Sequence, residues 1–127
     1  MERQASEVPS NVVQAIRHAS QHDRLLVSAI SMWEVAMLVE KNRITLSAEP
    51  LTWIEGAISG PGMRVIPITP RIAVGSTRLP GRPHGDPADL ILMATAREIG
   101  AGLVTRDRQI LAYAERERAL AVIDARP

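Results

Sequence analysis

The chain has 127 residues, of which 46% are hydrophobic and 23% are charged, and its formal net charge at pH 7 is +1. This length and composition predict one globular domain and exclude an intrinsically disordered chain. The sequence has no apolar run long enough to span a membrane, no apolar core of a signal peptide at its start, and no cysteine. We therefore expect a cytoplasmic protein without disulfides or thiolate metal sites.

Strands and helices are predicted to alternate along the chain, which is typical of an α/β domain with a parallel sheet. Helices are expected at residues 10–22, 31–41, 50–58, 70–78, 87–99 and 108–118, and strands at residues 24–28, 64–68, 103–105 and 121–123. Pro67 indicates that the second strand lies at an edge of the sheet. Asp86 followed by Pro87 is a strong signal for a helix start, and the glycines at 100 and 102 end that helix.

Four acidic residues stand near the starts of three predicted helices. Glu34 follows Ser31 at the spacing of a capping box, in which each side chain would accept from a backbone amide of the helix start. Asp86 and Asp107 are candidate N-caps, and Asp89 falls in a first turn, where the helix dipole favours negative charge. Capping explains each acid alone but does not require all four to converge. Convergence at the carboxyl ends of parallel strands predicts a site for a hard divalent cation.

The histidines are weaker candidates. His18 and His22 have the i, i+4 spacing of a metal-binding pair, but their polar neighbours favour a solvated helix surface. His84 lies in a loop rich in glycine and proline, where we expect an exposed residue. The sequence contains no glycine-rich phosphate loop, no nucleophile elbow and no dinucleotide-binding fingerprint, so a small-molecule-binding domain is poorly supported.

Three segments resemble the PIN domain, and specifically the VapC-like ribonuclease toxins of bacterial toxin–antitoxin systems. They are VSAISMWEVAMLVEKNRITL at 27–46, HGDPADLILMATAREIGAGLVTRD at 84–107, and the closing strand at 121–124. The resemblance implies a three-layer α/β domain with a central parallel sheet over residues 1–127.

The resemblance also assigns roles residue by residue. Glu34 matches the family's helix glutamate, Asp89 the acid of its D-x-x-D element, and Asp107 the acid of its T-x-D turn. Asp86 matches the first acid of the D-x-x-D element and is a less certain metal ligand, while Thr105 and Ser31 are expected to support the site. These matches imply a site for Mg²⁺ or Mn²⁺.

Two departures from the family pattern stand out. Leu90 occupies a position where the family often has arginine, which weakens the expectation of a local salt bridge. In addition, the family opens with an apolar strand that ends in a metal-binding aspartate and lies in the middle of the sheet, and we find no match to it. We therefore expect an N-terminally truncated domain with an open slot between two flanking strands, which would lack backbone hydrogen bonds.

The resemblance implies a metal-dependent endoribonuclease that acts on RNA, forms a homodimer and binds a cognate antitoxin protein. Since one acid is unmatched, we expect weak cation binding and low or no activity. The alternative is a catalytically inactive PIN remnant that retains antitoxin binding.

Overall fold

The computed structural model of the chain describes residues 8–127, so predictions that concern the first seven residues lie outside it. The elements are α1 (Ser10–Gln21), β1 (Leu25–Ser28), α2 (Ala29–Glu40), α3 (Pro50–Ile58), β2 (Met63–Ile66), α4 (Pro70–Gly75), α5 (Pro87–Ile99), β3 (Leu103–Thr105), α6 (Arg108–Glu117) and β4 (Val122–Asp124). Every predicted helix and strand is present, and the differences lie at their ends. No helix among the described residues has the length and apolarity needed to cross a membrane.

Three of the boundaries differ from the prediction for local reasons. The helix expected from residue 31 begins at Ala29, because the Oγ of Ser28 accepts a hydrogen bond from the Ile30 amide at 3.1 Å and caps it. The strand expected over 64–68 ends at Ile66, since Pro67 has no amide to donate. The helix expected over 70–78 ends at Gly75, and the next residues form turns.

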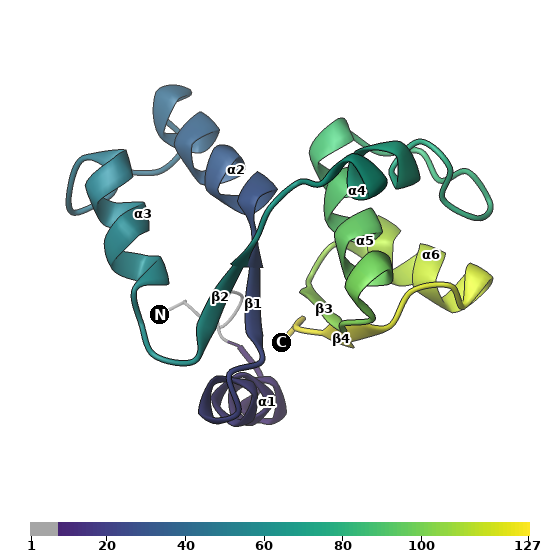
Figure 1. The fold of residues 1–127 in the computed structure, drawn as a ribbon, viewed down its shortest axis with the longest axis horizontal. Helices are drawn as coiled ribbons and strands as arrows, with labels where there is room; N and C mark the ends of the chain where they lie inside the picture. Colours follow the sequence, from purple (N-terminus) through teal and green to yellow (C-terminus); the bar gives the residue numbers. More distant parts are fainter. Residues whose placement is uncertain (1–7) are drawn as a thin grey trace.

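The strands form two separate parallel pairs. β1 pairs with β2, with Leu25 opposite Met63, and β3 pairs with β4, with Leu103 opposite Val122. Because β2 pairs only with β1 among the described residues, its predicted edge position is confirmed. Figure 1 shows β1 and β2 with α1, α2 and α3 on one side of the molecule, and β3 and β4 with α4, α5 and α6 on the other.

The main core lies in the second half of the chain. Its buried side chains come from α4, α5, β3 and α6 and from the segments beside them: Ile72, Leu79, Met93, Ala94, Ala96, Leu103, Ile110, Tyr113, Ala114 and Leu120. Tyr113 brings its hydroxyl into this core and donates a hydrogen bond to the carbonyl oxygen of Pro80 at 2.7 Å. α2 contacts α5, and this helix pair joins the two halves of the molecule.

The predicted open slot between two flanking strands is observed. A groove of about 930 Å³ lies between the two strand pairs and is lined by residues of β1 and β3 together with parts of α1 and α5. Val104 of β3, which an uninterrupted parallel sheet would cover, has 40% of its surface exposed. The described residues therefore form the two outer parts of a parallel sheet without a strand between them.

Candidate carboxylate site

Three of the four predicted acids lie at the starts of α5 and α6, and the fourth, Glu34, lies in the first half of α2. Asp86 is the N-cap of α5, where its Oδ1 accepts from the Asp89 amide at 3.0 Å. Asp107 is the N-cap of α6, where its Oδ1 accepts from the amides of Gln109 at 2.8 Å and Ile110 at 3.0 Å. Both predicted capping roles are confirmed.

Glu34 has no capping role, so the capping-box interpretation is wrong. α2 begins at Ala29 and is capped by Ser28, which places Glu34 well inside the helix. Helix capping therefore does not explain why α2, an otherwise mostly apolar helix, carries the partly buried Glu34. The predicted supporting residue Ser31 belongs to the first turn of α2 and lines the groove between β1 and β3.

The acids interact electrostatically with one another. Partial burial, followed by the charges of Asp89 and Asp86, raises the pKa of Glu34 above its ordinary value. Burial likewise raises the pKa of Asp89, with further contributions from the charges of Asp86 and Asp107. Burial and the neighbouring acids thus disfavour the ionised carboxylates of Glu34 and Asp89, and a bound cation would relieve this cost.

The predicted acids do not form a complete metal site in this structure. Among residues 8–127, no three histidine, cysteine, aspartate or glutamate side chains lie close enough together to hold a metal ion. The donor chemistry, carboxylate oxygens without nitrogen or sulfur, suits Mg²⁺ or Mn²⁺. The donor chemistry therefore fits such a cation, whereas the ligand geometry is incomplete.

Thr105 holds Asp107 in place. Its Oγ1 accepts from the Asp107 amide at 3.0 Å, which fixes the turn between β3 and α6.

Leu90, next to Asp89, packs against the hydrophobic core, so this position contributes packing to the helix start. The helix was expected from residue 31, but its cap is Ser28, the serine at the end of the apolar strand.

The histidines do not join the acids. His18 and His22 are exposed on α1, as predicted, with ring centroids 4.2 Å apart and the Nδ1 of His22 2.8 Å from the carbonyl oxygen of His18. His84 is exposed in its loop.

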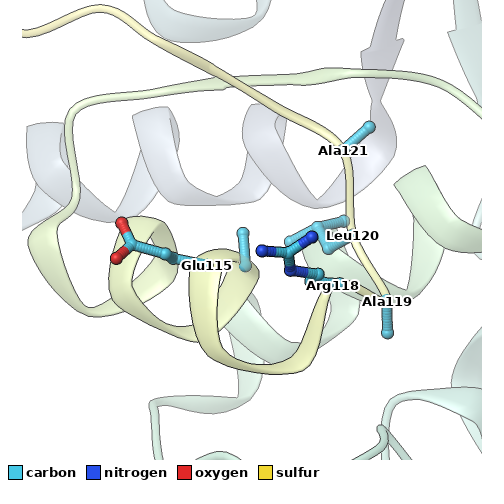
Figure 2. A pocket seen from close by; sticks show the side chains of 6 residues that line it. Glu115, Arg118, Ala119, Leu120 and Ala121 are labelled. Atoms are coloured by element: carbon cyan, nitrogen blue, oxygen red, sulfur yellow. The ribbon is translucent and has the colours of Figure 1, made fainter.

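A separate hollow lies where α6 ends and the chain turns toward β4. Figure 2 shows Glu115, Arg118, Ala119, Leu120 and Ala121 around it. Its volume is about 510 Å³, and none of the predicted site residues lines it. We assign it no role.

The two capping aspartates have structural roles that can be separated from any role of their charge. Asp107→Ala should lower the free energy of unfolding by about 1–2 kcal/mol, because two helix-start amides lose their acceptor. Asp107→Asn should cost much less, since an amide oxygen caps equally well. Urea unfolding of both variants measures this, and equal losses would contradict the capping role.

The raised pKa of Glu34 predicts a pH-dependent stability. A carboxyl group whose pKa is higher in the folded state binds its proton more tightly there, so its contribution to stability falls as the pH rises above about 4. In buffer with EDTA, Glu34→Gln should match the parent protein at low pH and be more stable at pH 7, by at most about 1 kcal/mol for so exposed a group. The measurement is the unfolding free energy of both proteins from pH 4 to 8. A variant less stable by the same amount at every pH would show that the carboxylate is not repelled.

Known proteins match this arrangement over most of the chain. The PIN domain family model matches residues 6–116. Ribonuclease VapC22 from Mycobacterium tuberculosis strain ATCC 25618 / H37Rv is 42% identical over 100 residues, which cover 79% of this chain and 73% of that protein. The crystal structure of DNA-bound VapBC from Salmonella typhimurium superposes with a TM-score of 0.61 at 22% identity, over 91% of this chain and 85% of that one, and shares the fold. The chain therefore belongs to the PIN domain family and is a homologue of a VapC ribonuclease.

Proposed function

We propose that this chain is a metal-dependent endoribonuclease of the VapC type whose cation site is weak. The observation that carries the proposal is the placement of Glu34, Asp89 and Asp107 within or at the starts of three helices, where burial and neighbouring acidic charges raise the pKa of Glu34 and of Asp89. The 42% identity to a VapC ribonuclease supports RNA as the substrate.

Glu34, Asp89 and Asp107 would hold the cation, with Asp86 as a further candidate. A bound Mg²⁺ or Mn²⁺ would supply a positioned, activated water and neutralise charge on the scissile phosphate. The protein's own contribution is to place the carboxylates: Thr105 and the α6 amides orient Asp107, and the Asp86 cap fixes the first turn that carries Asp89. Since the ligand geometry is incomplete, we expect weak affinity for the cation and slow cleavage.

The test is cleavage of fluorescently labelled RNA by the purified chain across a titration of Mg²⁺ and Mn²⁺. The proposal predicts slow cleavage that rises with cation concentration up to the millimolar range and stops with EDTA. A folded sample that cleaves no RNA at any concentration of either cation would contradict it.

A second function is favoured by a different observation. Large apolar side chains are exposed on α2 and α3, including Trp33 at 53% and Leu51 at 61%, and the two helices contact each other. An exposed apolar surface of this kind is typical of a protein–protein interface. It would serve a homodimer or a cognate antitoxin.

The exposed apolar surface of α2 and α3, together with the incomplete ligand geometry of the acids, would suit an inactive PIN protein that retains antitoxin binding. A small ribbon-helix-helix or AbrB-like reading frame beside the gene would supply the partner for a co-purification assay. Complex formation together with no RNA cleavage would select this function over the nuclease.

A further inference from the structure

The segments that follow β3 and β4 leave the sheet at the same edge. Thr105, the last residue of β3, pairs with Asp124, the last residue of β4. Because the two strands are parallel, their carboxyl ends meet at one edge, which is where open α/β sheets bind ligands. The Ala125 amide donates to the Thr105 carbonyl at 2.9 Å, and the Arg106 Nε donates to the Ala125 carbonyl at 3.0 Å. These bonds hold the two segments together just beyond the strands.

Three arginines gather at this edge. They line a hollow of about 520 Å³, which we call the arginine hollow and which is formed by Arg106, Arg108, Asp124, Arg126 and Pro127. Three guanidinium groups against one carboxylate give these lining side chains a net positive charge, and none of the five residues is a large aliphatic or aromatic one. Arginine binds phosphate through paired N–H donors. The lining therefore suits a phosphate group better than an apolar segment of a protein.

Asp124 orients one of these arginines. Its Oδ1 accepts from the Arg126 Nε at 3.0 Å, and its Oδ2 accepts from the Arg126 Nη2 at 2.7 Å. The same Oδ1 accepts from the Arg126 amide at 2.9 Å, so the side chain and the backbone of Arg126 are fixed together. A guanidinium group has more N–H donors than this ion pair uses. Arg126 therefore keeps donors for a second oxyanion while Asp124 fixes its plane.

Arg108 contributes a charge that no carboxylate neutralises. It is the first residue of α6 and follows the N-cap Asp107, so the helix start fixes its backbone position. Arg108 is exposed and forms no ion pair with any residue from 8 to 127. An anion that enters the arginine hollow can therefore bind Arg108 without first breaking an ion pair.

The arginine hollow adjoins the candidate carboxylate site. Arg106 and Arg108 are the chain neighbours of Asp107, whose charge helps to raise the pKa of Asp89. Acidic and basic groups thus share the turn between β3 and α6. An RNA strand bound at the acids carries further phosphates on both sides of the bond to be cleaved. The acids repel these phosphates and the arginines attract them, so charge complementarity directs the strand across the arginine hollow.

We propose that the arginine hollow binds a backbone phosphate of the RNA substrate, with Arg108 and Arg126 as its contacts. Both are positioning residues, which hold the strand beside the carboxylates and take no part in the cleavage step. The inference rests on the proposed function for the identity of the substrate, and it does not depend on the affinity of the cation site. The adjoining hollow along α6 shares these two arginines but adds Glu115 and apolar side chains, so it suits a phosphate less.

Binding of single-stranded RNA in buffer with EDTA tests the proposal without cleavage. The probe is a short, fluorescein-labelled oligoribonucleotide of mixed sequence, followed by fluorescence anisotropy. Arg108→Gln and Arg126→Gln should each weaken binding by at least about threefold and reduce the salt dependence of the dissociation constant. Arg108→Lys keeps the charge and should retain most of the affinity. Arg17→Gln removes the same charge from an exposed position on α1 and, as the matched control, should leave binding nearly unchanged.

The contradicting outcomes are distinct. The proposal is overturned if the parent protein binds no RNA, if the two glutamine variants bind as the parent does, or if Arg17→Gln loses as much affinity as they do. Tighter binding of a polyglutamate peptide than of the oligoribonucleotide would also overturn it, in favour of an acidic protein partner.

A parallel cleavage assay with Mn²⁺ separates this inference from the proposed function. A parent protein that cleaves RNA, with glutamine variants that bind it unchanged, would refute the arginine hollow alone. A parent protein that binds RNA through the arginines and never cleaves it would refute the nuclease alone.

Discussion

Replacing Asp89 by asparagine is expected to abolish the cation-dependent cleavage of RNA, with a loss of at least about a hundredfold. Asp89 interacts electrostatically with both Asp86 and Asp107, and its charge also raises the pKa of Glu34. A cation held by the cluster would therefore lose its most central ligand.

The fold should tolerate this substitution. The Asp89 side chain caps no helix, and its backbone amide still donates to Asp86 in the variant. The loss of a negative charge in the first turn of α5 costs up to about 1 kcal/mol, and relief of repulsion from the neighbouring acids offsets part of that. The measurement is the initial rate of RNA cleavage at saturating Mn²⁺, with circular dichroism as the folding control. Asp86→Asn, which keeps the cap, is the matched variant and should lose less activity. Full activity in Asp89→Asn would exclude this residue from the site.

Gly62→Ala is expected to cause the largest loss of stability, at least about 3 kcal/mol. Gly62 has a positive φ of 78°, and a Cβ atom at this position would collide with the backbone of Ser20 at the end of α1. A collision with backbone cannot be relieved by a change of rotamer. α1 and the turn before β2 would have to move apart. This movement would also break the hydrogen bond that the Ser20 hydroxyl donates to the Pro61 carbonyl.

Gly60→Ala is the matched control for this prediction, because a Cβ atom there meets no atom within 4 Å. Thermal and urea unfolding of the two variants should give a large loss for Gly62→Ala and a small one for Gly60→Ala. Similar, small losses in both would show that α1 does not pack against this turn as described.

The sequence predicted the elements well because their signals are local. The Asp86–Pro87 start of α5 and the cap at Asp107 follow from short-range backbone hydrogen bonds, and both are observed. The start of α2, expected at residue 31 and found at Ala29, depends on where β1 ends, and β1 is set by pairing with β2, which lies far along the chain. That boundary was wrong for this reason.

The candidate site was predictable only in part. Resemblance predicted one site for the acids. Neighbouring acids raise the pKa of Glu34 and of Asp89, but no three possible ligand side chains among residues 8–127 lie close enough to hold a metal ion. Whether they approach closely enough to share a cation depends on how α2 packs on α5, a tertiary contact that no local pattern fixes. The open slot followed from the unmatched strand, but the strands that flank it were known only from the pairing of both strand pairs.

Binding of Mn²⁺, followed by electron paramagnetic resonance, tests the central claim most directly. If Glu34, Asp89 and Asp107 form a cation site, the parent protein should bind Mn²⁺ weakly and saturably, and Asp89→Asn should weaken binding by at least about tenfold, while Glu115→Gln, outside the cluster, should leave it unchanged. Identical Mn²⁺ binding by the parent protein and Asp89→Asn, or no binding by either, would contradict a carboxylate-held cation in this protein.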